Sequence, residues 1–441
     1  MRILEWQTLS EESRQETLSR PKAAENQAQE VRQILAAVKT EGDLALRNYS
    51  KKFDGCDIQN FLIGEADLKE AELALDTSSL NAFDQAIGNI DTYHRSQLRG
   101  ASLCQLGEGH VISRETRPIE RVGFYIPGGS AVLVSTLMML AVPAKIAGCD
   151  SIVVCTPPDR FGNISPLLLG LLAKLGINQV FRIGGAQAIA AMAYGTATVP
   201  KVDKIFGPGN SWVTTAKMLV AEDADGSSID MPAGPSELML LADASSNPEF
   251  VAADLLSQAE HGADSQVILL SLDRSFVAKV MLEIKRLLKA LPRIDLILKS
   301  LEHGAAILVK DQAEAVDIIN RYAPEHLSLQ VADFSNYLPL IQNAAAIFCG
   351  PWTPESAGDY ATGANHVLPT GAWARSLGGL SVDSFQKTLS IQTLSSSALA
   401  RLSSTIERLS SMEGLAAHGL AVSLRMKNLL ENSDGQEVEN A

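Results

Sequence analysis

The chain has 441 residues, of which 46% are hydrophobic and 20% are charged, and its formal net charge is −14. A chain of this length has enough material for roughly two to four domains with buried cores. Its mixed, scattered charge is typical of a soluble globular protein rather than a disordered one. Because an acidic chain without a basic stripe repels phosphates, we expect no nucleic acid as a partner.

The start of the chain and its apolar stretches argue against secretion and against a membrane span. The N-terminal residues MRILEWQTLSEESRQE carry acids where a signal peptide needs an apolar core. The most apolar long stretch, 131–144, contains polar residues and a proline and is too short to cross a bilayer. Five cysteines without a CxxC spacing fit reduced thiols rather than disulfides or a zinc knuckle. We therefore expect a cytoplasmic protein with no membrane partner.

The first 120 residues are predicted to form helices and then strands. Residues 8–48 carry apolar side chains at helical spacing, and Pro21 divides them into a short arm and a longer helix. Residues 66–98 are also predicted to be helical, and residues 100–120 to be rich in strands. We expect these N-terminal helices to pack on the second of the two α/β series that follow.

A repeated unit of strand, glycine-rich turn and helix begins at Arg121. The apolar strands show little alternation, which indicates burial on both faces, and their alternation with helices implies parallel pairing through crossover helices. This pattern predicts a doubly wound parallel sheet. The expected pairs are RVGFYIP with the helix to Gly148, SIVVCTPP with ISPLLLGLLAKLG, QVFRIGG with AQAIAAMAYG, and KIFGPGN with SWVTTAKMLV.

A second α/β series starts at Glu237. Its expected strands are ELMLLAD, QVILLSL, AAILVKD, EHLSLQV and AAIFCG, with helices between them. Residues 351–380 form a long loop with glycines and prolines, and a loop of that length in a compact protein is usually functional. Residues 384–432 are predicted to be helical, and the polar tail NSDGQEVENA to be disordered.

The stretch Ile229–Gly262 is the first candidate for chemistry. It is predicted to form a turn, a short strand and a helix that ends near Gly262. Gln258 and His261 stand three residues apart on that helix, so their side chains share one face. The negative end of the helix dipole lies there and suits a bound cation. A loop rich in proline and glycine precedes the strand and brings Ser236 to the same place.

A metal site needs more ligands than this helix supplies. By residue type, Asp359 and His418 are good candidates to join Gln258 and His261, since two imidazoles, a carboxylate and an amide oxygen suit Zn²⁺ or a similar divalent ion. The alternative is that Gln258 and His261 only satisfy backbone groups at a helix end.

A second candidate is the pair Glu325 and His326 at the start of a predicted strand. Pro324 disfavours helix for Ala323, so the pair lies at a junction of loop and strand. A carboxylate beside an imidazole is a plausible general acid/base pair, and a solvated strand end is the alternative. The glycine turns IPGGS, IGGAQ and FGPGN could cradle a pyrophosphate, but none is a GxGxxG followed by an acid.

Together these segments resemble the L-histidinol dehydrogenase family. The resemblance runs from about residue 120 to 430, and its motifs are long and in the family's order. The motifs that carry it are VGFYIPGGS, GGAQAIAAMAYGT, VDKIFGPGN, IDMPAGPSELMLLAD, ADLLSQAEHG, APEHL, ESAGDYATGANHVLPT and EGLAAHGLAV.

The resemblance implies a zinc-dependent oxidation in the final steps of histidine biosynthesis. The family oxidises L-histidinol to L-histidine in two hydride transfers, using two NAD⁺ and passing through bound L-histidinaldehyde. One Zn²⁺ per subunit would be held by Gln258, His261, Asp359 and His418, the same four residues that residue type favours. In the family the zinc also holds the imidazole and amino nitrogens of the substrate, which fixes the reacting carbon.

The resemblance also implies roles for further residues. His326 would accept the alcohol proton, and Glu325 would activate water to hydrate the aldehyde. Ser236 and Glu413 match positions that contact the substrate, together with the zinc ligands and His326. The predicted contacts of NAD are Tyr125, Gln187 and Asn210, and His366 is a candidate for a supporting position behind the ligands.

The fold implied is α/β, with two doubly wound Rossmann-like domains with parallel sheets, an N-terminal helical arm and a small C-terminal helical domain. The arm would comprise residues 1–20. One α/β domain would be discontinuous, 21–120 with 237–380, and carry most of the zinc and catalytic residues. The other, 121–236, would bind NAD. The segment 381–441 would cross to the partner subunit of an intertwined homodimer.

This crossing implies shared active sites, because His418 and Glu413 would then complete the site of the partner subunit. Two other classes of function remain open on the residues alone. One is a zinc hydrolase in which Glu325 or Glu413 activates a metal-bound water. The other is a non-catalytic protein that binds a metal or a nucleotide.

Overall fold

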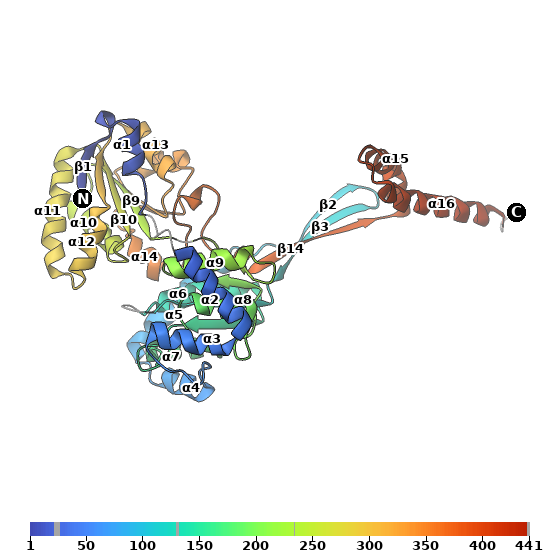
Figure 1. Cartoon of the computed structure of the whole chain (residues 1–441). Helices are drawn as coiled ribbons and strands as arrows, with labels where there is room; N and C mark the ends of the chain where they lie inside the picture. Colours follow the sequence, from blue (N-terminus) through green and yellow to red (C-terminus); the bar gives the residue numbers. More distant parts are fainter. Residues whose placement is uncertain (22–26, 129–131, 233, 439–441) are drawn as a thin grey trace. The chain divides into compact units, whose positions relative to one another are not determined.

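The chain folds into two compact units. The first, here called the main unit, comprises Met1–Leu98 and Ile119–Phe385, and the second, the tail unit, comprises Arg99–Pro118 and Gln386–Ala441. Figure 1 shows the helices and strands of both units, coloured along the sequence. The structure is a computed structural model that describes the backbone of residues 1–21, 27–128, 132–232 and 234–438, and side chains as far as Glu431.

One sheet of the main unit has six parallel strands in the order β1-β11-β10-β9-β12-β13. This confirms the parallel pairing predicted for the series that starts at Glu237. The edge strand β1 was not predicted; its sequence RILE is too short to show a period. The strands are β1 (Arg2–Glu5), β9 (Glu237–Ala242), β10 (Gln266–Ser271), β11 (Ala305–Leu308), β12 (His326–Gln330) and β13 (Ala346–Cys349).

Helices cover both faces of this six-stranded sheet, which explains its continuous apolar strands. Leu238 and Leu240 of β9 pack with α10, α11 and α12, whereas Met239 and Leu241 pack with α13 and with Trp6. Figure 1 shows α10, α11 and α12 together beside the sheet. The helices are α1 (Glu11–Thr17), α10 (Pro248–Ala259), α11 (Arg274–Leu287), α12 (Ile294–Glu302), α13 (Gln312–Tyr322) and α14 (Glu355–Tyr360).

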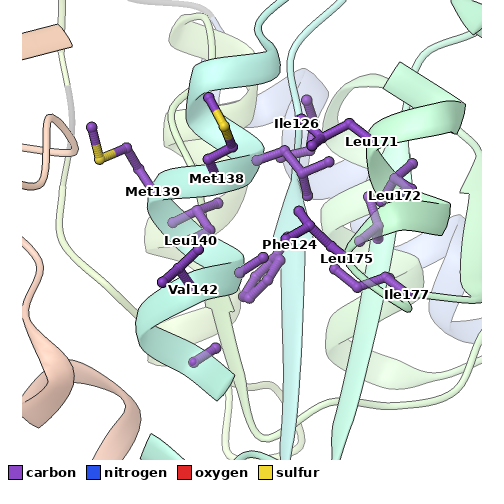
Figure 2. Close-up of a cluster of buried hydrophobic side chains, with 14 of the residues drawn as sticks. Phe124, Ile126, Met138, Met139, Leu140, Val142, Leu171, Leu172, Leu175 and Ile177 are labelled. Atoms are coloured by element: carbon purple, nitrogen blue, oxygen red, sulfur yellow. The ribbon is translucent and has the colours of Figure 1, made fainter. Parts of the chain in front are cut away.

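The other sheet of the main unit has five parallel strands in the order β6-β5-β4-β7-β8. The four units of strand and helix predicted from Arg121 onward are all present. They are β4 (Arg121–Tyr125), α6 (Val134–Ala147), β5 (Ser151–Thr156), α7 (Pro166–Lys174), β6 (Gln179–Arg182), α8 (Gly185–Tyr194), β7 (Lys204–Phe206), α9 (Ser211–Glu222) and the short β8 (Ser228–Ile229). Figure 2 shows Phe124 of β4 among side chains of α6 and α7, including Leu140 and Leu171.

The N-terminal helices pack on the five-stranded sheet, and the expectation that they pack on the second series was wrong. α2 and α3 share a core with α8 and α9 on one face, and α4 and α5 contact α7 and α6 on the other. An amphipathic pattern shows which face of a helix is buried but not which surface buries it. These helices are α2 (Gln27–Glu41), α3 (Asp43–Tyr49), α4 (Glu65–Leu73) and α5 (Thr77–Arg95).

The tail unit contains an antiparallel sheet in the order β14-β3-β2 and two helices. The strand-rich passage predicted at 100–120 is present, but the prediction of helix from residue 384 was wrong over β14, where alternation in QKTLSIQTL favours a strand. α16 also continues through most of the tail predicted to be disordered, and residues 439–441 lie outside the described residues. The elements are β2 (Ser102–Gly107), β3 (His110–Pro118), β14 (Gln386–Leu394), α15 (Ser396–Met412) and α16 (Ala416–Val438).

Among the helices that the structure describes, none is long and apolar enough to cross a membrane.

The turn after β7 needs a glycine at position 207. Gly207 has φ +117°, and a Cβ there would lie 2.2 Å from the Tyr125 carbonyl oxygen. Its N–H donates to Asp230 and its carbonyl accepts from Lys217, so the peptide has little freedom to move. Gly207→Ala should therefore lower the free energy of unfolding by at least about 2 kcal/mol, from strain and overlap together.

Chemical denaturation measures this loss. The control is Gly162→Ala, where φ is +82° but no atom lies within 4 Å of the added Cβ. It should cost about 1 kcal/mol from backbone strain alone. Equal losses in the two variants would contradict the role assigned to the close contact with Tyr125.

Candidate active site

A cavity of about 190 Å³ in the main unit brings together residues that are far apart in the sequence. Its lining includes Ser236, His261, Glu325, His326 and Asp359, all of which the sequence singled out. The loops after β4 and β7 of the five-stranded sheet also reach it, and the further lining residues are Leu133, Ser135, Thr136, Pro208, Gly234, Tyr360, His366, Val367, Leu368 and Thr370. The cavity therefore draws on both sheets.

Two neighbouring strands of the six-stranded sheet present the acid/base candidates at their amino ends. Ser236 directly precedes β9, and Glu325 directly precedes β12, of which His326 is the first residue. Ala323 leaves α13 in the left-handed conformation, with φ +52°, which is uncommon for a residue other than glycine. The helix thus ends before Pro324, as expected from the helix that Pro324 disfavours at Ala323. This turn points the pair toward the cavity instead of extending α13.

Glu325 is a buried carboxyl group with two donors. Its Oε2 atom accepts from the Ser236 hydroxyl at 2.6 Å and from the Glu237 N–H at 2.9 Å. Burial raises the pKa of Glu325 to about 8, although both donors oppose that shift. The group therefore changes between acid and base near neutral pH, as a general base requires.

His326 is buried beside the same carboxyl group and has the opposite shift. Its Nδ1 atom lies 3.2 Å from the Glu237 carbonyl oxygen and 3.5 Å from both Glu325 Oε2 and Glu355 Oε1. Burial lowers the pKa of His326 to about 4, so the ring is neutral at physiological pH. The Glu237 carbonyl favours the tautomer with a proton on Nδ1, which leaves Nε2 as the nitrogen that accepts a proton.

Glu355 is a third carboxyl group of this cluster, and the sequence reasoning missed it. It lies on α14 with no exposed surface, and neither of its oxygens has a hydrogen-bond partner among the described residues. Burial raises its pKa well above the ordinary value, and Asp359 and Glu325 add to the shift. The signal that could have found it is the motif ESAGDY, where it precedes Asp359 by one helical turn.

Gln258, His261 and Asp359 offer ligand atoms that suit a divalent metal. His261 Nε2 lies 3.7 Å from Asp359 Oδ2, while its Nδ1 lies 3.1 Å from the Ser257 carbonyl, which leaves Nε2 free to bind a metal. Gln258 is fully buried, and neither atom of its amide has a hydrogen-bond partner in the part of the chain that the structure describes. Because an unpaired buried amide is costly, a ligand for that oxygen is expected.

His261, Asp359 and Glu355 each offer one atom that could bind a metal, and these three atoms lie within 4.8 Å of one another. Nitrogen and oxygen donors at such distances fit Zn²⁺. α10 ends at Ala259, earlier than predicted, but the His261 N–H still bonds to the Gln258 carbonyl at 3.2 Å. The two residues therefore keep the helical spacing on which the sequence argument depended.

The charges of this group agree with an ion-binding role. Burial disfavours the protonated form of His261, but the Asp359 carboxylate more than offsets it and raises the pKa of His261. The pKa of Asp359 is lowered, because His261 and the other imidazoles outweigh its burial. His366, the candidate supporting residue, lies 2.8 Å from the Asp359 carbonyl through Nδ1, and burial lowers its pKa. Thr136 Oγ1 lies 3.4 Å from the other nitrogen of His366.

The three residues expected to contact NAD line one separate cavity of about 400 Å³. Tyr125 ends β4 and Asn210 follows β7, the two neighbouring strands between which the strand order reverses, and Gln187 follows β6 at the same carboxyl edge of the sheet. Dinucleotides bind at this position in doubly wound sheets. The Tyr125 hydroxyl accepts from the Gly185 N–H at 3.1 Å, and Asn210 caps α9. Gly129 and Ser130 of the turn IPGGS lie outside the described residues.

The other two site residues predicted from the sequence belong to the tail unit. Glu413 is the residue after α15, and His418 lies in the first turn of α16, where its N–H donates to the Leu415 carbonyl at 3.0 Å. Both side chains are exposed.

The chain is similar to known histidinol dehydrogenases over nearly its whole length. The family model described as histidinol dehydrogenase matches residues 18–426. A histidinol dehydrogenase of Vibrio parahaemolyticus is 44% identical over 434 residues, which are 98% of this chain and 100% of that protein. A putative histidine biosynthesis bifunctional protein of Photorhabdus laumondii is 46% identical over 440 residues, and this chain spans only 54% of its length.

A solved structure has the same fold. The crystal structure of histidinol dehydrogenase from Elizabethkingia anophelis superposes with a TM-score of 0.93 at 41% identity, covering 97% of this chain and 98% of that one. The match therefore extends through both units, and not only through the Rossmann-like sheets. The chain belongs to the histidinol dehydrogenase family, a family of oxidoreductases.

Proposed function

We propose that the protein oxidises L-histidinol to L-histidine through L-histidinaldehyde, with zinc and two NAD⁺, in the cytoplasm. The observation that carries the proposal is the pairing of Glu325 and His326 in one cavity, where burial shifts their pKa values in opposite directions. One cavity thus holds a neutral imidazole and a carboxyl group that ionises near neutral pH. Both are needed for two successive oxidations at one carbon.

His326 serves the oxidation of the alcohol. Because its Nδ1 faces the Glu237 carbonyl, Nε2 accepts the hydroxyl proton of the substrate while hydride leaves the adjacent carbon. A bound dinucleotide supplies the hydride acceptor. The residues that would hold it are Tyr125, Gln187 and Asn210, which line their own cavity.

Glu325 serves the oxidation of the aldehyde. As a carboxylate it takes a proton from water while the water oxygen adds to the aldehyde carbon, and return of that proton to the former carbonyl oxygen gives the hydrate. The hydrate carries a hydrogen on that carbon and can lose a second hydride. The Ser236 hydroxyl and the Glu237 N–H hold Oε2 in place for this proton transfer.

Gln258, His261 and Asp359, with His418, would hold the zinc. When bound, zinc supplies positive charge that fixes the imidazole and amino nitrogens of the substrate. The buried, unpaired amide of Gln258 supports this ligand set. His366 holds the backbone of Asp359 and keeps its carboxylate turned toward His261.

A homodimer with shared sites, in which Glu413 and His418 act in the partner's site, is part of the proposal. The tail unit supports it with large apolar side chains exposed on and between α15 and α16, which packing against a second copy of the chain would remove from water. These side chains are Leu409, Met412, Leu415, Leu420 and Leu424.

The yield of NADH separates this proposal from its rivals. Purified, zinc-loaded protein supplied with limiting L-histidinol and excess NAD⁺ should form about two NADH per substrate, because each oxidation transfers one hydride. Absorbance at the NADH band and chromatography of the product measure this. A zinc hydrolase or a binding protein would form none. A yield of about one, with aldehyde released, would contradict the second oxidation.

Glu325→Gln should impair the oxidation of the aldehyde far more than that of the alcohol. The amide cannot take a proton from water, so we expect a loss of about 10²- to 10⁴-fold in kcat for supplied histidinaldehyde. In the unsubstituted protein this rate should rise with pH, because the base form of Glu325 grows as the pH passes its pKa. The variant should lose that rise.

Single-turnover rates on each substrate across the pH range give both results. Glu283→Gln, on the surface of α11 in an ion pair with Arg286, is the matched control and should change neither rate. Equal losses of alcohol and aldehyde oxidation in Glu325→Gln would refute the assigned role.

His261→Ala should weaken zinc binding by about 100-fold or more, because it removes a direct ligand. Competition with a chromophoric chelator measures this without reference to catalysis, and activity should fall with the zinc content. His303→Ala, at the exposed end of α12, is the control and should bind zinc normally. Unchanged zinc affinity in His261→Ala would rule out the ligand.

A further inference from the structure

The N-terminal arm places Arg20 in contact with Glu237, the first residue of β9, which lies beside the acid/base pair. The Arg20 guanidinium donates through Nε to Glu237 Oε2 and through a terminal nitrogen to Glu237 Oε1 at 2.9 Å. The same terminal nitrogen donates to the Tyr322 carbonyl at 2.7 Å, and the guanidinium lies 3.9 Å from the centre of the Tyr322 ring. Only 1% of the Glu237 side chain is exposed. A two-pronged ion pair of this kind fixes orientation as well as charge.

Glu237 is in turn bonded to both catalytic residues. Its Oε1 accepts from the Glu325 N–H at 3.3 Å, and its own N–H donates to the Glu325 carboxyl at 2.9 Å. Its carbonyl is the acceptor that faces His326 Nδ1. One residue therefore holds the backbone and side chain of the base and selects the tautomer of the imidazole.

The charge of Glu237 needs a partner at this depth, because a buried carboxylate left alone is strongly unfavourable. The Tyr322 hydroxyl lies 3.1 Å from Glu237 Oε2 but also 2.8 Å from Gln266 Oε1, and its single proton can serve only one of them. Tyr322 is moreover uncharged. Among the described residues, Arg20 is the only cation in an ion pair with Glu237.

We propose that Arg20 is a positioning residue of the reaction, which acts through Glu237 to hold Glu325 and His326 in their working geometry. The inference rests on the proposed function and extends it, because it makes the arm part of the active site. The Ser19 carbonyl accepts from Gln266 Nε2 at 2.9 Å, so a second contact keeps the arm in place beside Arg20.

Removing the guanidinium should have an electrostatic effect as well as a geometric one. Without it, the Glu237 carboxylate repels the Glu325 carboxylate, so Glu325 should ionise at higher pH. The groups that act on Glu325 from the elements around it are Ser236, Glu237, His261, Tyr322, His326 and Glu355. None of them is changed by a substitution at Arg20.

The test compares Arg20→Met with Arg20→Lys in the full-length, zinc-loaded protein. Arg20→Met should lower kcat for histidinaldehyde by about 10- to 100-fold, as expected for a displaced catalytic group. KM should change less than threefold, since Arg20 does not line the cavity. Arg20→Lys keeps the charge but not the fork and should recover part of kcat. Circular dichroism checks that each variant is folded.

A second measurement follows Glu325 directly and does not depend on activity. Carbon-13 NMR of the glutamate carboxyl groups, with Glu325 assigned by the signal lost in Glu325→Gln, should show its titration at higher pH in Arg20→Met. The double variant Arg20→Met with Glu237→Gln removes both charges and should return the titration toward that of the parent. Arg274→Gln, which breaks only an exposed ion pair to Glu5 of the same arm, should change nothing.

A folded Arg20→Met protein with the parent's kcat and Glu325 titration would overturn the inference. A loss of kcat in Arg20→Met would also overturn it if the double variant lost as much kcat and the titration of Glu325 stayed unchanged. If Arg20→Met does not fold, Arg20→Lys and the double variant decide between these outcomes in the same way. Absence of NADH from the unsubstituted protein would refute the proposed function instead, and the NMR titration would still decide the role of Arg20.

Discussion

The burial of carboxyl groups around His326 is the constraint on which the site depends. Glu237, Glu325 and Glu355 are all buried, and three like charges at this depth could not coexist without compensation. The three groups differ in how the charge is compensated. Glu237 pairs with Arg20, and Glu325 accepts two hydrogen bonds. Glu355 has no hydrogen-bond partner among the described residues and favours the neutral form. These solutions determine which group is charged, and hence which can accept a proton.

The two sheets of the main unit contribute residues from opposite strand ends. The five-stranded sheet offers the carboxyl ends of β4 and β7, where glycine turns open a cavity that suits a dinucleotide. The six-stranded sheet offers the amino ends of β9 and β12, which carry Ser236, Glu325 and His326. Loops after β4 and β7 also line the cavity that holds Glu325 and His326, so in the proposed reaction a hydride acceptor and a proton acceptor would serve the same carbon.

Much of the fold and part of the site could be predicted because the signals are local. Continuous apolar strands alternate with helical segments from Arg121 to Cys349, and both sheets of the main unit are parallel as expected. Gln258 with His261, and Glu325 with His326, are neighbours in the chain and show their chemistry as pairs. The strand β14 was missed because its alternating residues were read as part of a helical tail.

The sequence by itself determined the alternation of elements, the candidate ligands and acid/base groups, and the family resemblance, since all three depend on residue types at short spacing. Only the tertiary structure decided which sheet the N-terminal helices pack on. It also decided that Arg20 contacts Glu237 and that Glu355 lies beside His326. These contacts join residues many positions apart. Whether an arginine or a glutamate is buried, and which residues it contacts, depends on the complete tertiary fold.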